Sequence, residues 1–314
     1  MPPGHDTAGG SAEESAGESS STAEDPLVRP HLILTGTGTS VGVPVVGCQC
    51  DVCLSDNPRN RRLRSGVLIR APGGDMVIDT GPELRLQLLE NNVRIVRAAL
   101  FTHAHADHIM GLDDLRICSF RLEHEVIQLA RSAVAERGEA FDESAFLKTG
   151  AGRIPLYCEA NVEESLRHTF HYAFDSDTVP SHRYAVPRLE FVSVQPGEQR
   201  DILGLSVIPV RLHHGRLPIL GFRIGNTAFC TDVSSIPAES RELLTDLDTL
   251  ILDALRYEPH PTHFHVEQAV KWARRLKARR TVLTHMAHDL DFDRLTAELP
   301  DGIEPGYDGL RIEL

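Results

Sequence analysis

The sequence lacks any hydrophobic run long enough to cross a bilayer, and its first 25 residues contain no Val, Ile, Leu, Phe, Tyr or Trp. A positively charged stretch followed by an apolar one is also missing at the start, so we expect no secretory signal. Because a segment without large apolar side chains cannot offset the entropy of ordering, residues 1–27 are predicted to be a disordered acidic tail. These absences predict a soluble, cytoplasmic protein with no membrane partner.

Positive charge is also scarce. The formal net charge is −13, and six of the negative charges lie in the tail, which leaves the body near −7. An acidic body argues against binding of a large nucleic acid, but it is compatible with a small phosphate ester as substrate.

The six cysteines do not suggest a disulfide framework. Three lie close together and three are scattered through apolar sequence, which favours a reducing compartment and one cysteine-rich metal site. The clustered residues are Cys48, Cys50 and Cys53, and the scattered ones are Cys118, Cys158 and Cys230.

Beyond the tail, we interpret residues 28–314 as a single domain of the α/β (α+β) class. Short apolar runs typical of strands form two groups, which are separated by helical sequence and end in His or Asp residues. This order predicts two packed, mixed β-sheets with outer helices, a four-layer αββα sandwich. The pattern weakens at about 122–186, where we expect a helical insert with one plausible strand at IPLYCEA, residues 154–160.

The glycine-rich stretch GTGTSVGVPVVGCQCDVC, residues 36–53, is not a phosphate-binding P-loop. No Lys-Ser or Lys-Thr follows the glycines, and Pro44 stands where the phosphate-binding helix would begin. Its three thiolates can occupy three corners of a tetrahedral zinc site, which then needs one more ligand. Cys118, Cys158 or Cys230 as that ligand, or three unligated thiols, are alternatives.

The sharpest signal is the pattern H-x-H-x-D-H, which directly follows the apolar run AALF. Two histidines two residues apart at a strand end can bind one cation, and the next Asp and His are then available to a second. Three later apolar runs end in further candidate ligands, as a two-metal hydrolase requires. The candidates are His103, His105, Asp107 and His108 in the motif, and His213, His214, Asp232, His285 and His288 later in the chain.

This array resembles the metallo-β-lactamase superfamily of metal-dependent hydrolases. Within it, the segments VIDTGPELR, HHGRLPILGFRI, HPTHFHVEQA and LTHMAHDLD are similar to the branch that opens phosphoribosyl 1,2-cyclic phosphate. The resemblance covers about 31–121 and 189–314. It implies the metallo-β-lactamase fold and a phosphodiesterase in which a hydroxide bridging two metal ions attacks phosphorus.

The resemblance also implies a role for each ligand. His214 is preferred to His213 because the family has a His-Gly pair, and His288 completes the structural zinc site of Cys48, Cys50 and Cys53. The ligands of one active-site cation, zinc or manganese, would be His103, His105 and His214, and those of the other Asp107, His108 and His285, with Asp232 as the bridge.

Two further residues join Asp107 in the implied catalytic set. Asp79 resembles a carboxylate that orients a ligand imidazole, although a turn residue at a strand end also fits its position. His263 resembles a histidine that acts on the substrate or leaving group, a role suited to imidazole near neutral pH. His260 and His265 are its neighbours and rivals.

Two other segments have both a functional and a structural interpretation. The run of Arg59, Arg61, Arg62 and Arg64 suits a terminal phosphate, but such runs are more often solvated surface. The turn at 307–309 resembles the closing turn of the branch, and its side chains either approach the site or serve only the fold.

The same ligands also serve other members of the superfamily. Thioester hydrolases of the glyoxalase II kind and tRNA 3′-processing nucleases share them, whereas a non-catalytic carrier related to pyrroloquinoline quinone synthesis has a degraded histidine array. An iron oxygenase on this scaffold is a further alternative. The cysteine cluster and the segments GPELR and HPTHF favour the phosphodiester branch, and the acidic body counts against the tRNA nuclease. A homodimer is an open alternative to a monomer.

Overall fold

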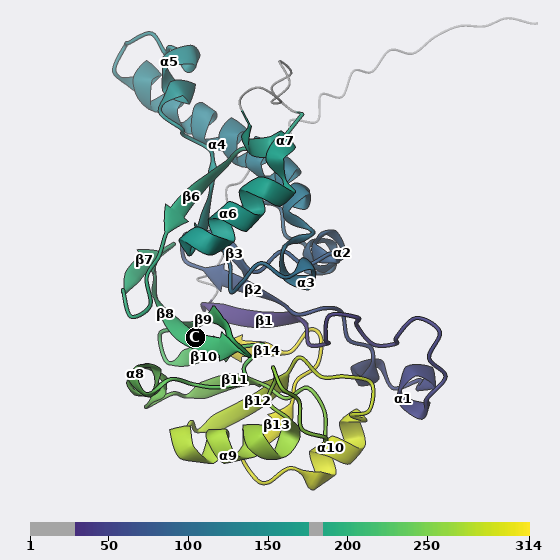
Figure 1. The fold of residues 1–314 in the computed structure, drawn as a ribbon. Coiled ribbons are helices and arrows are strands. Elements are labelled where there is room, and N and C mark those ends of the chain that lie inside the picture. Colours follow the sequence, from purple (N-terminus) through teal and green to yellow (C-terminus); the bar gives the residue numbers. More distant parts are fainter. Residues whose placement is uncertain (1–28, 176–184) are drawn as a thin grey trace, which may run out of the picture.

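Two seven-stranded mixed sheets pack against each other in the computed structural model, which describes residues 29–175 and 185–314 (Figure 1). The predicted tail therefore lies outside the described residues. The first sheet has the order β14 (Arg311–Glu313), β1 (His31–Gly36), β2 (Gly66–Ala71), β3 (Gly74–Ile78), β4 (Val96–Leu100), β5 (Ile154–Cys158) and β6 (Leu189–Ser193).

The second sheet is built mostly from the C-terminal half of the chain. Its antiparallel part is β7 to β10, and its parallel part is β10 to β13. In order the strands are β13 (Ile303–Pro305), β12 (Arg280–Thr284), β11 (Thr249–Asp253), β10 (Thr227–Cys230), β9 (Leu217–Ile224), β8 (Leu205–His214) and β7 (Arg200–Ile202).

Helices cover the outer face of each sheet, with the larger groups above and below the sheets in Figure 1. One group lies on the first sheet: α2 (Leu84–Glu90), α3 (Ala106–Ile109), α4 (Leu115–Glu136), α6 (Ala160–Thr169) and α7 (His171–Phe174). The short α5 (Glu143–Lys148) follows the far end of α4 and buries no residue. The other group lies on the second sheet: α8 (Ala238–Arg241), α9 (Val266–Leu276) and α10 (Phe292–Glu298). The short α1 (Asp51–Leu54) belongs to the cysteine-rich loop.

Three apolar layers hold this arrangement together, because side chains alternate between the two faces of each strand. In β2, Val67 and Ile69 pack between the sheets, whereas Leu68 packs against the helices of the first sheet. A third layer lies between the second sheet and α9. The predicted four-layer αββα sandwich of mixed sheets is confirmed.

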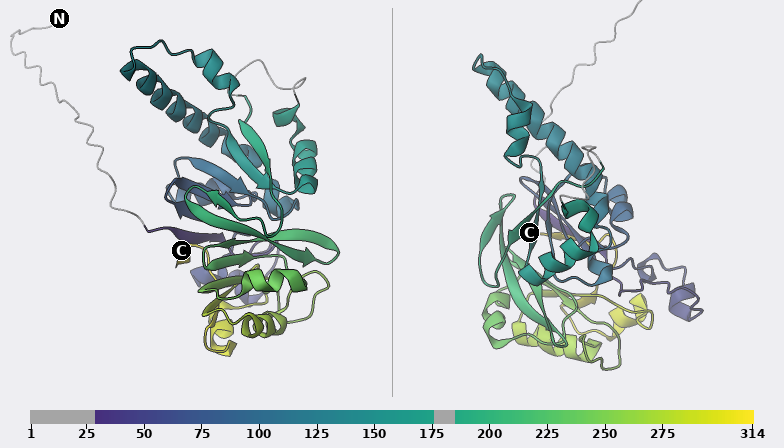
Figure 2. Two further views of the ribbon diagram at one scale, coloured as in Figure 1. Left: turned by 90° about the vertical axis from the view of Figure 1, so that its left-hand side faces the viewer. Right: turned by 45° about the horizontal axis from the view of Figure 1, so that its top comes forward.

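The segment predicted as a helical insert, 122–186, is helical only in part. It contains most of α4, all of α5 to α7, and also β5, which pairs with β4 and β6 inside the first sheet. The run IPLYCEA, expected to be a strand within this segment, corresponds to β5. The part that projects from the sandwich is the far end of α4 with α5 (Figure 2). Residues 176–184 of the segment lie outside the described residues.

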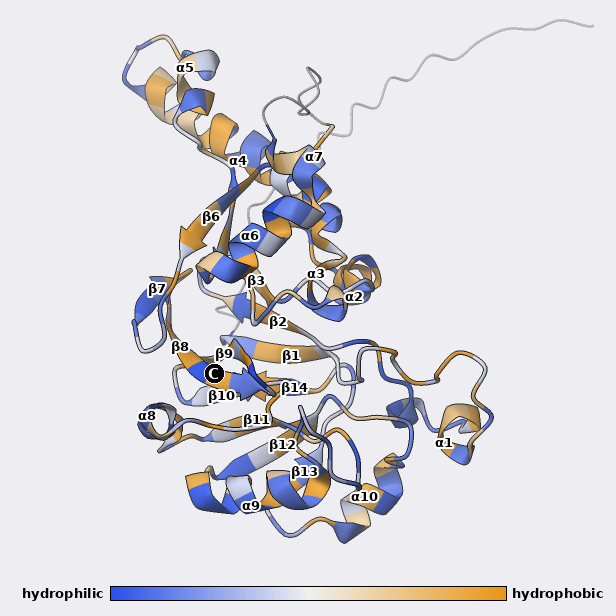
Figure 3. Ribbon diagram, viewed as in Figure 1, coloured by the Kyte–Doolittle hydropathy of each residue, from blue (hydrophilic) through white to orange (hydrophobic). Residues whose placement is uncertain are grey.

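The outer helices are amphipathic rather than uniformly apolar (Figure 3). In α9, Ala269, Ala273 and Leu276 are buried, whereas the charged residues lie on other faces. No helix in the part of the chain that the structure describes is long and apolar enough to span a membrane.

Candidate metal centre

The predicted ligands meet at one edge of the two packed sheets. The H-x-H-x-D-H motif follows β4, and His214 ends β8. Asp232 comes two residues after the end of β10, and His285 directly follows β12. Because β10 and β12 run in the same direction within one sheet, their carboxyl ends lie at the same edge. Segments far apart in the sequence thus deliver their side chains to one place.

Three residues of this edge have an unusual backbone. Asp79, Asp232 and His285 have φ angles of 64°, 59° and 59°, in the left-handed region that residues with a Cβ rarely adopt. Each follows a buried strand, so the positive φ turns the chain sharply and aims the side chain across the strand ends. Strain of this kind persists where the surrounding structure holds it and is concentrated at functional sites.

Asp232 lies at the middle of the cluster. Its Oδ2 is 3.4 Å from His108 Nε2, and its Oδ1 is 3.4 Å from His285 Nε2. Asp232 belongs to two groups that could each hold a metal ion. One is formed with His103 and His108, and the other with Asp107 and His285. Within each group the ligand atoms lie within 4.8 Å of one another. This position is the one that a bridging carboxylate requires.

The second half of the cluster consists of imidazoles alone. His103 Nε2 is 3.0 Å from His105 Nδ1, and these two form another such group with His214. His214 Nδ1 lies 2.8 Å from the carbonyl oxygen of Thr262, which fixes the ring and leaves Nε2 free for the site. The cluster therefore offers an imidazole-rich and a carboxylate-containing position side by side.

His213 points elsewhere, because neighbouring residues of a strand face opposite sides. Its Nδ1 is 3.3 Å from the hydroxyl oxygen of Ser235, and its backbone pairs with Ser234 and Ser235. The structure thus brings His214, and not His213, to the other candidate ligands.

The donor set fits two divalent cations. His108 Nε2 is fully buried without a hydrogen-bond partner, although Asp107 Oδ2 is only 3.2 Å away. Burial raises the pKa of Asp232, but His285 and His108 outweigh it and hold that pKa well below its usual value. Buried carboxylates that stay ionised need positive charge close by, and imidazole with carboxylate is a donor set that zinc and manganese accept.

Asp79 lies behind the cluster rather than in it. Its Oδ2 is 2.7 Å from His108 Nδ1, and its carboxylate also accepts hydrogen bonds from the backbone N–H and the hydroxyl of Thr102. A carboxylate on the far nitrogen of an imidazole fixes the ring, so that Nε2 faces the metal position. This geometry is the one expected for an orienting carboxylate.

His263 also lies at the cluster, and its partner is a residue that the sequence did not single out. His263 Nε2 is 4.0 Å from Asp232 Oδ1, and its Nδ1 is 3.0 Å from Oδ2 of Asp253, the buried last residue of β11. Burial raises the pKa of Asp253 and lowers that of His263. The only sequence signal for Asp253 was an acidic residue at the end of the apolar run LDTLILD.

The two rivals of His263 lie farther out. His260 packs against His263 with a ring distance of 5.2 Å, and its Nδ1 accepts a hydrogen bond from the backbone of Thr262. His265 precedes α9 and lies 4.0 Å from Glu267. Of the three, His263 has the carboxylate contacts with the cluster.

A second, separate group joins the cysteine-rich loop to the segment after β12. The Sγ atoms of Cys48 and Cys50 are 3.2 and 3.4 Å from His288 Nδ1, and Cys53 completes a group whose ligand atoms lie within 4.8 Å of one another. A hydrogen bond from the backbone of Cys53 lowers the pKa of the Cys50 thiol to about 6, whereas burial raises that of Cys53 to about 11. Three thiols and one imidazole fit a closed zinc site, which would hold all three as thiolates.

The other cysteines are not near this group. Cys118, Cys158 and Cys230 are buried in the apolar layers of the sandwich, and burial raises the pKa of each thiol. The alternative of a fourth ligand from one of them has no support in the geometry.

The arginine run is largely structural. Arg62 is buried and donates to the carbonyl oxygens of Ala287 and Leu290 at 2.9 and 2.6 Å, which fixes the turn that carries His288. Arg59 stacks on Phe292 and Tyr307 at 4.8 and 4.7 Å.

The rest of this region also braces the loops. Arg64 forms an ion pair with Glu83, whereas Arg61 is exposed. In the closing turn, Asp308 accepts hydrogen bonds from the backbone of Thr37 and Leu63 at 2.8 and 2.6 Å, so this turn braces the loops beside the site.

Known proteins match this sequence and this fold. A family model described as a beta-lactamase superfamily domain matches residues 143–286, and one described as the metallo-beta-lactamase superfamily matches residues 59–117. A crystal structure of a new diphosphatase from the PhnP family is 39% identical with a TM-score of 0.76, over 91% of this chain and 98% of that one.

Two curated relatives differ in how much of their length is matched. An octanoyltransferase from Porphyromonas gingivalis is 36% identical over 283 residues, which are 89% of this chain, so this chain spans only 51% of that protein. A ribonuclease Z from Bradyrhizobium diazoefficiens is 24% identical over 301 residues, which cover 84% of this chain and 93% of that protein. The nearly complete match to the PhnP-family diphosphatase, together with the two family models, shows that this chain belongs to the metallo-β-lactamase superfamily.

Proposed function

We propose that this protein is a dinuclear metal-dependent phosphodiesterase that opens a small cyclic phosphate ester of the phosphoribosyl 1,2-cyclic phosphate kind. The observation that carries the proposal is the pair of Asp253 and His263, which places an imidazole supported by a carboxylate 4.0 Å from the central Asp232. A proton donor beside a two-cation site suits a reaction whose leaving group is a strong base.

The two cations, zinc or manganese, would supply charge neutralisation at phosphorus and activation of water. His103, His105 and His214 would hold one, Asp107, His108 and His285 the other, and Asp232 would lie between them. Asp79 would keep the His108 ring oriented through their contact of 2.7 Å. The protein itself forms no covalent bond to the substrate in this scheme.

The role of His263 is to protonate the departing oxygen. Opening a cyclic phosphodiester releases an alkoxide, which is a far stronger base than a thiolate, whose conjugate acid has a pKa of about 8.5. A thioester hydrolase therefore has less need of an acid at this place. Because Asp253 occupies Nδ1 of His263, Nε2 is the nitrogen that faces the substrate.

A second candidate function is hydrolysis of a small diphosphate. It is favoured by the 39% identity to a protein described as a diphosphatase. The difference lies in the leaving group, since a phosphate needs less protonation than an alkoxide. The octanoyltransferase is about twice as long as the part of it that this chain matches. Its acyl-transfer activity is therefore not part of the proposal.

A structural zinc held by Cys48, Cys50, Cys53 and His288 would brace the site from outside. His288 lies three residues after His285, so the clamp ties the cysteine-rich loop to the segment that carries a metal ligand. Arg62 supports the same turn through the carbonyl oxygens of Ala287 and Leu290.

The deciding experiment is a substrate panel on protein whose metal content has been measured. The panel compares a ribosyl 1,2-cyclic phosphate, nucleoside cyclic phosphates, bis-p-nitrophenyl phosphate, a nucleoside diphosphate ester and a glutathione thioester. We expect kcat/KM to be highest for the ribosyl cyclic phosphate. A higher value for the diphosphate would select the second candidate, and a higher value for the thioester would overturn both.

A further inference from the structure

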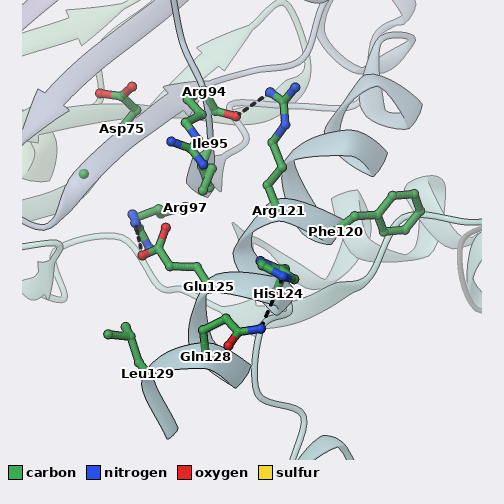
Figure 4. A pocket seen from close by; sticks show the side chains of 11 residues that line it. Asp75, Arg94, Ile95, Arg97, Phe120, Arg121, His124, Glu125, Gln128 and Leu129 are labelled. Atoms are coloured by element: carbon green, nitrogen blue, oxygen red, sulfur yellow. Dashed lines mark hydrogen bonds and ion pairs between the residues drawn. The ribbon is translucent and has the colours of Figure 1, made fainter. Parts of the chain in front are cut away.

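Polar side chains outside the metal centre differ from those behind it in their access to water. A hollow of about 850 Å³ lies between α4 and the starts of β3 and β4 (Figure 4). Its charged side chains are exposed or half-buried, as in the ion pair of Arg97 with Glu125, so water can replace a partner that is lost there. Behind the metal centre the polar side chains are buried, and a lost partner is not replaced in this way.

Thr102, the residue before His103, has a buried hydroxyl with two close polar partners. Its Oγ1 is 2.7 Å from Asp79 Oδ2 and 2.9 Å from His103 Nδ1. Asp79 Oδ2 also lies 2.7 Å from His108 Nδ1. All four side chains are buried. They therefore form one continuous chain of hydrogen bonds, which runs from His103 through Thr102 and Asp79 to His108.

The direction of each hydrogen bond follows from the groups that form it. A carboxylate can only accept, so Asp79 accepts from the hydroxyl of Thr102 and from Nδ1–H of His108. The hydroxyl has one hydrogen, which it donates to Asp79, so its oxygen accepts from Nδ1–H of His103. Both imidazoles thus carry their proton on Nδ1 and keep the lone pair of Nε2 for a cation.

This chain of hydrogen bonds joins the two halves of the cluster from behind. His103 belongs to the imidazole group with His105 and His214, whereas His108 is a ligand proposed for the other cation. Hydrogen bonds in a buried network strengthen one another, and the loss of one partner leaves a buried donor unpaired. The orientation of one imidazole therefore affects the orientation of the other.

Two other buried threonines precede candidate ligands, but they are bonded differently. The hydroxyl of Thr231 is 2.6 Å from Asp232 Oδ2 and 3.5 Å from His285 Nδ1, which is at the limit of a hydrogen bond. Thr284 directly precedes His285, and its Oγ1 has no hydrogen-bond partner among the residues that the structure describes. Of the three threonines, Thr102 is the one whose hydroxyl has two partners within 3.0 Å.

We propose that Thr102 is a positioning residue that couples the two cation positions. Its hydroxyl holds His103 in a fixed orientation relative to Asp79 and His108, so that removal of the hydroxyl weakens the binding of both cations. Thr102 itself acts only through these neighbours. The proposal rests on the two-cation centre of the proposed function, but not on its substrate.

The test is a titration of the full chain with manganese ions after the central cations have been removed, followed by calorimetry and by the spin-resonance signal of free manganese. Manganese is the probe because imidazole and carboxylate bind it, whereas the thiols of the cysteine group favour zinc. We expect two manganese ions per unmodified chain. Thr102→Val keeps the shape of the side chain and the backbone N–H that Asp79 accepts at 2.8 Å. It is expected to raise both stepwise dissociation constants roughly 10- to 100-fold.

Thr102→Ser and Thr102→Ala separate the hydroxyl from the fold. Thr102→Ser retains the hydroxyl and should bind both ions nearly as the unmodified chain does, whereas the smaller Thr102→Ala should act like Thr102→Val. The matched control is Thr284→Val, which removes a buried hydroxyl without a partner and should leave both constants unchanged. A rise in only one constant, or in neither, in Thr102→Val overturns the coupling, and so does an equal rise in Thr284→Val.

The same titration distinguishes this proposal from the proposed function. Two manganese ions whose binding weakens together in Thr102→Val, in a chain that hydrolyses no phosphate ester of the panel, would contradict the proposed function and support the coupling. A single manganese ion per unmodified chain would contradict the two-cation centre and the coupling with it. Phosphodiesterase activity with two ions that bind equally well in Thr102→Val would overturn the coupling alone.

Discussion

The molecule has two groups of candidate metal ligands, and they differ in burial and in composition. In the cysteine group, three half-buried thiols of one loop meet one imidazole from the segment after β12, enough for one closed tetrahedron. In the central group, imidazoles and carboxylates are mostly buried at the strand ends and outnumber the donors that one cation needs. Both groups fit cations, but only the central one has an additional imidazole, His263, that a buried carboxylate supports. This difference is the reason why we propose a structural role for the cysteine group and a catalytic role for the central one.

The largest expected effect comes from the residue that joins both halves of the central group. Asp232→Asn keeps the shape of the side chain and tolerates the positive φ of 59°, but it removes the charge. We expect kcat/KM to fall roughly 10³-fold or more and the central metal content to drop, because the bridging charge is lost. Metal analysis and steady-state kinetics measure both, and zinc in the cysteine group should be unchanged. Full activity in Asp232→Asn would remove the basis for a two-cation centre.

The second largest effect is expected at His263, which we propose as a proton donor and not as a metal ligand. His263→Ala should retain both central metals and lose roughly 10²- to 10⁴-fold in turnover of a cyclic alkyl phosphate. The loss should be much smaller for bis-p-nitrophenyl phosphate, whose leaving group needs little protonation. His265→Ala, which changes a nearby histidine outside the cluster, is the control. Loss of a central metal in His263→Ala would make this residue a ligand.

A smaller effect is expected at the residue behind His263. Asp253→Asn keeps an acceptor for Val233 N–H, 2.8 Å away, but weakens the support of the imidazole. We expect a 10- to 100-fold loss, as for other residues that orient a functional imidazole, with a shifted pH profile. In the double variant with His263→Ala the two losses should not add, because both act through one proton transfer. Additive losses would show that Asp253 serves only the fold.

These residues also show what the sequence was able to predict. The sandwich and the central cluster were accessible because the ligands stand close together in one motif or directly at the ends of apolar runs. Asp253 was not, because a single acidic residue at a strand end is common and its partner lies ten residues away across a turn. The choice of His214 over His213 rested on resemblance, and the alternation of side chains along β8 supplied the physical reason.

Strand β5 was expected from the run IPLYCEA, but its place in the sheet was not. The strand is short and lies between weakly patterned helices, so the sequence does not show which strands it pairs with. Only pairing with β4 and β6 defines it as part of the sheet.

The smallest effect on the reaction is expected in the cysteine group. Cys50→Ser removes one thiolate from a set of four ligands, so zinc content should fall by one equivalent while the two central cations remain. Thermal stability should decrease, because the loop is no longer tied to the segment after β12, whereas kcat of the folded variant should change little. Cys230→Ser, which alters a buried thiol in the outer layer, serves as the control. Unchanged zinc content in Cys50→Ser would contradict a zinc site in the cysteine group. A large loss of kcat in a fully folded Cys50→Ser variant would show that the cysteine group also affects the reaction at the central group.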